Sequence, residues 1–199
     1  AGIDMGSKTI KVVILKDGDV LARSLVGSGF ETRESAEEAL KDALNKAGLT
    51  LKDIDRIVST GAGRKEAPHI NDDITEVGAG ARGIFFLYPS VRTLIDVGAE
   101  EGRGIKCSPA GKVLDFVVNE KCAAGAGSFT ESMARALEVS LEEFGKMSLT
   151  SDKKIPMNAQ CAVFAESEVV SLIHAKTPKA DIAKAVHDAI ASRVISMVR

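Results

Sequence analysis

The sequence has few cysteines, no long apolar run and almost no net charge, and each shortage excludes a class of protein. Three cysteines in 199 residues, an odd number at wide spacing, do not form the disulfide framework of a secreted domain. No apolar run approaches the roughly 18 residues of a membrane span, and no signal peptide is visible. The formal net charge of -2 gives no reason to expect nucleic acid or a membrane surface as partner. We therefore expect a cytoplasmic protein in a reducing compartment.

The remaining composition is that of an ordinary globular protein, with 45% hydrophobic and 27% charged residues. A chain of 199 residues can bury a substantial core, as one large domain or two small lobes. It opens at AGIDMG directly in a strand pattern and closes at ASRVISMVR in helical periodicity, without a C-cap signal. We interpret it as a piece of a longer protein, truncated at the C-terminus.

Strand and helix patterns alternate along the chain, which is typical of an α/β fold. A β-branched run at Ile3–Leu15 leads through a turn at residues 17–19 into a second run at Val20–Val26, which predicts a hairpin. Helical spacing with Gly48 as a stop predicts a helix at Arg33–Ala47. The other predicted elements are strands at Ile54–Thr60 and Val91–Val97 and helices at Glu76–Leu87, after Cys122, after Cys161 and at Asp181–Val198.

Two segments of the chain repeat each other. The run IDMGSKTIKVVILKDGDVL from Ile3 lines up with IDVGAEEGRGIKCSPAGKVL from Ile95 at an offset of 92 residues. Each copy reads as a strand, an Asp-x-Gly turn, a return strand and a third strand. Such a repeat favours a duplicated lobe, each with a mixed sheet and helices packed on it. We predict one lobe at residues 1–90 and a second at residues 91–199.

The two Asp-x-Gly turns are candidate phosphate-binding elements. Such a turn points a carboxylate out of the sheet end, and its glycine lets backbone amides approach a phosphate. Two turns facing each other across a cleft suit the β- and γ-phosphates of a nucleotide, although Asp and Gly are also common turn formers. The aspartates would hold Mg²⁺ through water and orient an attacking water, and Ser7 and Lys11 would contact phosphate oxygens. The candidate residues are Asp4, Gly6, Ser7 and Lys11 in the first copy and Asp96, Gly98 and Glu101 in the second.

Paired phosphate turns in duplicated lobes resemble the acetate kinase/sugar kinase/Hsp70/actin superfamily, with its ribonuclease H-like fold. The segments GIDMGSKTIK, STGAGR, LIDVGAEEG, NEKCAAGAGSF and NAQCAVFAESEV, in this order, resemble the BadF/BadG/BcrA/BcrD ATPase family over essentially the whole chain. That family comprises ATP-hydrolysing iron–sulfur activators of 2-hydroxyacyl-CoA dehydratases and the ATPase subunits of benzoyl-CoA reductase. The two cysteine segments are the most specific part of the resemblance.

The sequence departs from the family pattern at two places. At Lys8 the superfamily usually has Thr or Ser, so a hydroxyl contact is lost there. The second turn of the activators usually reads Gly-Gly-Gln-Asp, whereas this chain has GAEE at residues 98–101. The change adds carboxylates and removes a glycine, which implies a different water-positioning residue or a weakened ATPase.

Cys122 and Cys161 each precede a predicted helix. A helix N-terminus carries unpaired amides and about half a positive charge, which favours a thiolate. A small buried hydrophobe is the plainer interpretation of any lone cysteine, and we assign it to Cys107. Two distant thiols exclude a Cys-x-x-Cys metal site and are too few for a four-cysteine cluster, whereas two chains on a two-fold axis supply four. The resemblance implies this arrangement, with one [4Fe–4S] cluster bridging a dimer.

The resemblance also implies an activity. ATP with Mg²⁺ is hydrolysed, and an electron from reduced ferredoxin or flavodoxin passes through the cluster to an acyl-CoA reductase or dehydratase component. The segments IDVGAEEGRGIK and IPMNAQCAVFAESEVVSLIHAKT favour a benzoyl-CoA reductase ATPase subunit over a 2-hydroxyacyl-CoA dehydratase activator. The second ATPase subunit of the dimer is identical or homologous. Two other classes stay open: a sugar or acyl kinase without a metal centre, and a non-catalytic nucleotide-sensing subunit.

One further charged residue has two open interpretations. Arg64 in the loop TGAGRKE would reach either a phosphate or the dimer partner. The three histidines lack metal-ligand spacing with one another or with the cysteines, so we assign them no role.

Overall fold

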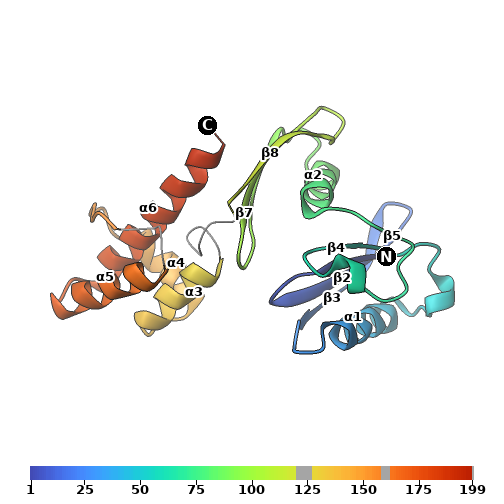
Figure 1. Cartoon of the computed structure of the whole chain (residues 1–199), viewed down its shortest axis with the longest axis horizontal. Helices are drawn as coiled ribbons and strands as arrows, with labels where there is room; N and C mark the ends of the chain where they lie inside the picture. Colours follow the sequence, from blue (N-terminus) through green and yellow to red (C-terminus); the bar gives the residue numbers. More distant parts are fainter. Residues whose placement is uncertain (120–126, 158–161, 199) are drawn as a thin grey trace. The chain divides into compact units, whose positions relative to one another are not determined.

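The computed structural model describes residues 1–119, 127–157 and 162–198. The chain forms two compact units, Ala1–Gly83 and Ile84–Arg199, whose strands and helices follow one another as drawn in Figure 1. Helix α2 (Glu76–Leu87) runs across the boundary between the units and matches its predicted range. The predicted division after residue 90 stays a prediction. In the described part of the chain, no helix is long and apolar enough to cross a membrane.

A five-stranded sheet forms the centre of the first unit, in the order β3-β2-β1-β4-β5. Its strands are β1 (Gly2–Met5), β2 (Thr9–Lys16), β3 (Asp19–Gly27), β4 (Val58–Thr60) and β5 (Asp72–Asp73). The first three pair antiparallel, and β4 and β5 continue the sheet parallel to β1 on its other side. This is the ribonuclease H-like order of strands. The run predicted at Ile3–Leu15 is therefore two strands joined by the first Asp-x-Gly turn.

Local sequence sets the ends of the next elements. Asp17 and Gly18, between β2 and β3, have φ values of 53° and 92°, which is the conformation that two-residue hairpin turns require. Helix α1 (Thr32–Ala47) ends at Gly48, whose φ of 66° lies in the left-handed region. The predicted hairpin and the predicted helix are both confirmed.

The core of the first unit lies between the sheet and α1, which covers one face of it. The buried core residues are Ile3, Met5, Ile10, Val12, Ile14, Ala36, Ala39, Leu40, Ala43, Leu44, Ile57 and Ala67. The strand predicted at Ile54–Thr60 is shorter than expected and begins only at Val58. A 3₁₀ turn at Leu51–Asp53 precedes it, closed by a capping box between Thr50 and Asp53, and this turn delays the entry into the sheet.

The second unit combines a three-stranded antiparallel sheet with four helices. The sheet has the order β6-β7-β8, formed by β6 (Thr93–Val97), β7 (Gly102–Cys107) and β8 (Val113–Asn119). The helices are α3 (Gly127–Ala136), α4 (Leu141–Ser148), α5 (Ala162–His174) and α6 (Lys179–Met197). Helix α4 was not predicted from the sequence. Its start nevertheless carries a helix signal, since Ser140 and Glu143 form a capping box there.

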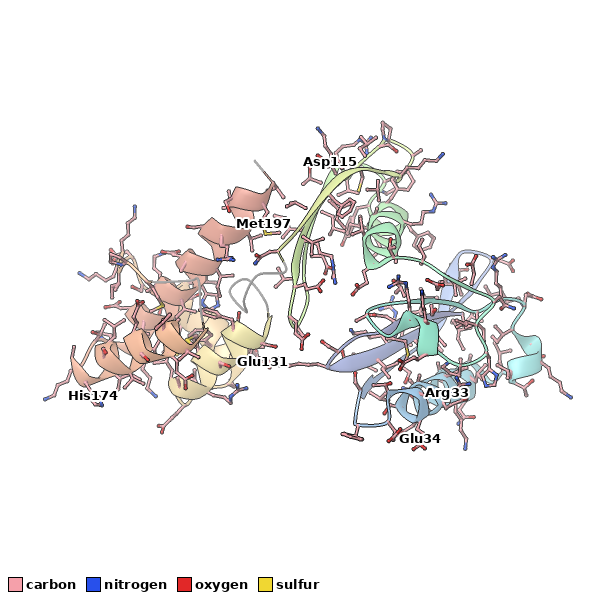
Figure 2. All side chains as sticks on the ribbon, in the orientation of Figure 1. Arg33, Glu34, Asp115, Glu131, His174 and Met197 are labelled. Carbon is pink, nitrogen blue, oxygen red and sulfur yellow. The ribbon has the colours of Figure 1, made fainter. Side chains whose placement is uncertain are left out.

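The helices of the second unit enclose its core. The apolar stripe of α3, Phe129 and Met133 with Leu137 just beyond it, is at most 1% exposed. It packs with residues of the other three helices: Phe144, Ala165, Val169, Ile182, Ala183 and Val186. The C-terminal end of α6, where Figure 2 labels Met197, packs on β7: a Cβ at Gly104 would lie 2.6 Å from Cγ1 of Val198. The predicted core-packing role of α6 is confirmed.

The sequence repeat is a structural repeat. Strands β1, β2 and β3 of the first unit correspond to β6, β7 and β8 of the second, each set an antiparallel meander. The register between the second and third strands of each set also shifts at an equivalent place. It shifts between Ile14 and Leu15 in one copy and between Lys106 and Cys107 in the other. Both units therefore present an Asp-x-Gly turn after their first strand.

Candidate functional site

The first turn carries an ion pair across two strands. Asp4 of β1 lies opposite Lys11 of β2 in the register, and Lys11 Nζ donates a hydrogen bond to Asp4 Oδ2 at 3.0 Å. The two side chains are 35% and 41% exposed, respectively, so a ligand in solution can reach both. The predicted Ser7 is exposed in the turn between these strands. The predicted residues of the first turn thus lie together.

Gly6 is required at this turn by close packing. A Cβ at Gly6 would lie 2.7 Å from the backbone oxygen of Thr9 and 3.2 Å from Lys11 Nζ. On its other side, Ser28 Oγ donates to the Gly6 carbonyl oxygen at 2.6 Å, and Ser28 is only 3% exposed. A side chain at this position would therefore displace the turn or the lysine.

A second glycine loop, from the STGAGR segment, lies against Asp4. Gly61 has a φ of 93°, and a Cβ on it would be 2.6 Å from both Asp4 Oδ1 and the Met5 carbonyl oxygen. The Gly63 amide donates to that same Met5 oxygen at 3.1 Å. Only glycine permits such a close approach in this conformation. This segment carried part of the family resemblance, but its contact with Asp4 was not predicted.

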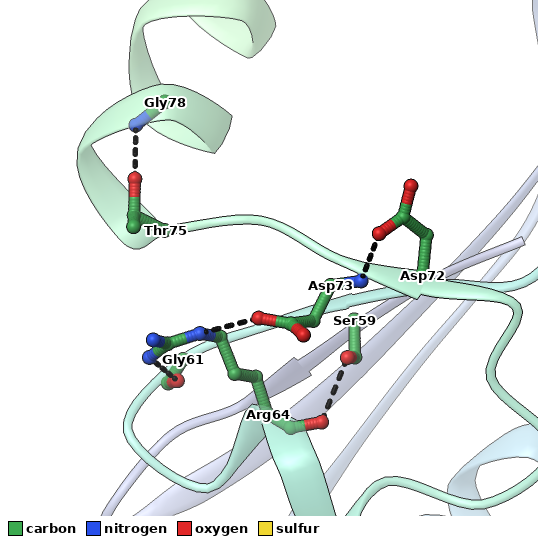
Figure 3. A network of polar contacts seen from close by, with 7 residues as sticks. All are labelled: Ser59, Gly61, Arg64, Asp72, Asp73, Thr75 and Gly78. Carbon is green, nitrogen blue, oxygen red and sulfur yellow. Dashed lines mark hydrogen bonds and ion pairs between the residues drawn. The ribbon is translucent and has the colours of Figure 1, made fainter.

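Arg64 ties the glycine loop to the edge of the sheet, as Figure 3 shows. Its Nε donates to Asp73 Oδ1 of β5 at 2.8 Å, and its Nη1 lies 3.5 Å from the Gly61 carbonyl oxygen. Its own carbonyl oxygen accepts a hydrogen bond from Ser59 Oγ at 2.7 Å, and Ser59 is fully buried. The arginine therefore has a role in holding the loop, besides the two roles left open by the sequence.

The second turn carries a larger ion-pair group. Asp96 of β6 lies opposite Arg103 of β7. Arg103 donates through Nη1 to Asp96 Oδ2 at 2.9 Å and through Nη2 to Glu101 Oε2 at 2.7 Å. Both carboxylates are 42% exposed, whereas the Arg103 side chain is 9% exposed. The Gly98 amide closes the turn by donating to the Glu101 carbonyl oxygen at 2.8 Å.

The second turn is also bound to the start of helix α3. The Gly127 amide donates to the Gly98 carbonyl oxygen at 2.8 Å, and the Ser128 amide donates to the Ala99 carbonyl oxygen at 3.0 Å. Amides in the first turn of a helix have no partner within the helix. Here two of them bind the candidate phosphate turn, so the position of α3 and that of the turn depend on each other.

The two candidate cluster ligands, Cys122 and Cys161, lie outside the described residues. The helices predicted after them are confirmed, since α3 begins at Gly127 and α5 directly after Cys161. Cys107, at the end of β7, is 1% exposed, in accordance with a structural role. Among the described residues, no three His, Cys, Asp or Glu side chains form a group that could hold a metal ion.

The carboxylates of the turns are chemically suited to Mg²⁺. This ion binds through one or two protein carboxylates and otherwise keeps water and phosphate ligands. Asp4 and Asp96 each offer a partly exposed carboxylate near the end of a strand. One such carboxylate, together with water and phosphate, is a usual ligand set for Mg²⁺.

A solved structure of a related protein has the same fold over almost the whole of this chain. The solved structure of the activator of the 2-hydroxyisocaproyl-CoA dehydratase from Clostridium difficile with bound ADPNP superposes with a TM-score of 0.90. It is 37% identical, over 98% of this chain and 73% of that one. The fold is therefore that of the acetate kinase/sugar kinase/Hsp70/actin superfamily, as predicted. The BadF/BadG/BcrA/BcrD ATPase family model matches residues 1–199, and the chain belongs to this family.

Two curated relatives represent the two branches that the sequence suggested. The 2-hydroxyisocaproyl-CoA dehydratase activator of Clostridioides difficile is 38% identical over 199 residues, which are 100% of this chain and 74% of the relative. A benzoyl-CoA reductase component of Thauera aromatica is 31% identical over 204 residues, which cover 100% of this chain and 72% of the relative. The prediction of an ATPase is confirmed by the family.

Proposed function

We propose that this protein is an ATP-hydrolysing subunit that delivers low-potential electrons to a radical acyl-CoA enzyme, as an activator of a 2-hydroxyacyl-CoA dehydratase. Family membership and the 38% identity to a dehydratase activator support this assignment. The benzoyl-CoA reductase ATPase preferred from sequence motifs is the second candidate. It has less support, because that relative is only 31% identical.

The observation that carries the proposal is the pair of backbone hydrogen bonds between the second turn and α3. Gly98 and Ala99 accept from the amides of residues 127 and 128, and Cys122 lies five residues before the first residue of that helix. A change at the turn when phosphate binds or leaves is transmitted to the cysteine segment through these bonds. A sugar or acyl kinase without a metal centre would have no use for the two cysteines that precede α3 and α5 in the sequence.

The side chains of the turns have distinct proposed roles. In the first turn, Asp4 would hold Mg²⁺ through water, and Lys11 and Ser7 would contact phosphate oxygens, with Gly6 allowing the close approach. In the second turn, Asp96 would act on the metal in the same way, Glu101 would orient the attacking water, and Gly98, without a side chain, would let phosphate approach the turn closely. Bound Mg²⁺ would supply neutralisation of the phosphate charge that develops during hydrolysis.

The remaining parts of the proposal concern electron transfer. Cys122 and Cys161 of two subunits, identical or homologous, would hold one shared [4Fe–4S] cluster in a cytoplasmic dimer. The cluster would supply a one-electron carrier between a ferredoxin or flavodoxin and the dehydratase or reductase component. In this chain, the starts of α3 and α5 follow the two cysteines closely in sequence, and helix N-termini favour anionic groups.

ATP hydrolysis by the full-length protein tests the first half of the proposal. Asp4→Ala and Glu101→Gln should each lower kcat by about 10²-fold or more, because each removes a group that acts on the transition state. Their thermal unfolding should stay close to that of the wild type, since both side chains are partly exposed. Unchanged hydrolysis in both variants would instead indicate a non-catalytic nucleotide sensor.

Anaerobic purification with iron analysis and electron paramagnetic resonance of the reduced protein tests the second half. Cys122→Ser and Cys161→Ser should each lose the iron and the visible absorption. Cys107→Ser is the matched control, because this buried thiol at the end of β7 should leave the iron content intact. Full iron in the Cys122→Ser dimer would disprove the cluster assignment, and a colourless wild type would favour a kinase-like protein.

A further inference from the structure

Arg103 occupies the position in the second unit that Lys11 occupies in the first. Each is the residue directly opposite the aspartate of its turn, in the register of β7 with β6 and of β2 with β1. The two cations are separated by the same 92 residues as Asp4 and Asp96. Both copies of the structural repeat therefore contain a cation that forms an ion pair with the aspartate of the turn.

The two cations differ in burial and in the number of their acidic partners. Lys11 is 41% exposed and binds one carboxylate. The Arg103 side chain is 9% exposed and bridges two, with its Nη1 on Asp96 and its Nη2 on Glu101. A lysine ammonium is a single point charge, whereas a guanidinium is planar and presents several donors in a fixed fork. The arginine thus fixes where the two carboxylates lie with respect to each other.

This geometry has a chemical consequence at the turn. Two neighbouring carboxylates repel each other, and a buried cation between them offsets that repulsion while leaving both acids 42% exposed to ligand. Glu101 is joined to the turn backbone as well, since its carbonyl oxygen accepts from Gly98. The acid that would orient water is therefore anchored at its backbone and at its side chain.

We propose that Arg103 is a positioning residue for ATP hydrolysis, which holds Glu101 and Asp96 in the orientation that the reaction needs. The proposal rests on the proposed function. It explains how the second turn works although it reads GAEE where the family's activators usually carry Gly-Gly-Gln-Asp: the additional carboxylate is bound by an arginine that both neutralises and aims it.

The test measures kcat and KM for ATP separately in the full-length protein. Arg103→Lys keeps the charge and loses the fork, so kcat should fall about tenfold or more while KM changes by less than about twofold. Arg103→Lys combined with Glu101→Gln should have a kcat close to that of Glu101→Gln alone, because the lysine variant misplaces the same carboxylate that Glu101→Gln removes. Arg56→Lys, the same exchange at an exposed ion pair with Asp72, is the matched control and should change neither kcat nor KM.

Arg103→Ala with added methylguanidinium provides a second measurement if Arg103→Lys does not fold. The small cation should restore a large part of kcat, which a purely structural role would not produce. An unchanged kcat in Arg103→Lys would overturn the positioning role. The same holds if the double variant loses kcat by the product of the two single losses, or if methylguanidinium does not restore kcat in Arg103→Ala. Absence of ATP hydrolysis in the wild type is a different result, since it would refute the proposed function itself.

Discussion

The two Asp-x-Gly turns share a hairpin but are supported by different neighbours. In the first unit, the turn is braced by a glycine loop of the same sheet, through the contact of Gly61 with Asp4. In the second, it is braced by the backbone amides at the start of α3, through Gly127 and Ser128. The first turn is thus fixed within a sheet, and the second is joined to a helix that leads back to a cysteine segment.

Equivalent residues of the two turns therefore have different surroundings. In the first turn, an exposed lysine pairs with one carboxylate. The second turn is held at its side chains by a buried arginine on two carboxylates and at its carbonyl groups by a helix. Both copies therefore share the hairpin, whereas the neighbours that hold its turn differ.

The largest expected effect concerns the glycine loop of the first turn. Gly61→Ala forces a side chain into positive φ, which costs about 1–3 kcal/mol, and places a Cβ 2.6 Å from Asp4 Oδ1 and the Met5 backbone. We expect a loss of about 3 kcal/mol or more in the free energy of unfolding, with ATP hydrolysis reduced at least about tenfold. Denaturant unfolding and steady-state kinetics measure both quantities.

Gly18→Ala is the matched control for this variant. Gly18 has nearly the same φ, 92° against 93°, but a Cβ on it meets nothing within 4 Å among the described residues. It should cost about 1–2 kcal/mol of stability and leave hydrolysis per folded molecule unchanged. Equal effects of the two substitutions would show that the contact with Asp4 is unimportant.

Alanine substitutions at the equivalent glycines of the two turns should have effects of intermediate size on the free energy of unfolding. A Cβ at Gly6 would be 2.7 Å from a backbone oxygen, whereas one at Gly98 would be 3.3 Å from the Glu101 carbonyl oxygen. Gly6→Ala should therefore lower the free energy of unfolding by about 2 kcal/mol, and Gly98→Ala by less than about 1 kcal/mol. Parallel thermal melts measure this, and the reverse ranking would contradict the packing of the first turn.

The smallest expected effect concerns the arginine that holds the glycine loop. Arg64→Met removes a partly exposed ion pair with Asp73, so the stability change should be below about 1 kcal/mol. Because the loop then loses its tie to β5, kcat should fall about threefold to tenfold, which corresponds to about 0.7–1.4 kcal/mol in the barrier. Steady-state kinetics of ATP hydrolysis measure this change.

The neighbouring pair offers the control for Arg64. Arg56 binds Asp72, the neighbour of Asp73 in β5, and both side chains are more than half exposed. Its guanidinium donates to that carboxylate rather than to the glycine loop. Arg56→Met should change neither kcat nor KM for ATP. If the two arginine variants behave alike in the kinetic assay, Arg64 has no special role at the first turn.

Much of the fold was predictable because local signals and periodicity agreed. The offset repeat identified both meanders, Gly48 marked the end of α1, and the stripe of Phe129, Met133 and Leu137 marked the buried face of α3. The missed helix α4 had a capping signal at Ser140, but eight residues of mixed polarity give little periodicity. The strand at Val58 was predicted too long, because a 3₁₀ turn at Leu51–Asp53 delays the entry into the sheet, and Ile54 and Ile57 are apolar because they pack in the core.

The candidate site was predictable only in part, for a physical reason. The sequence by itself determined the turn residues, since Asp-x-Gly after a strand leaves few conformations and the repeat supplies a second example. It also determined the family. The tertiary structure alone decided that Gly61 lies against Asp4, that Arg103 bridges Asp96 and Glu101, and that α3 binds the second turn. These contacts join segments distant in sequence or depend on side-chain geometry, and packing, rather than local propensity, selects them.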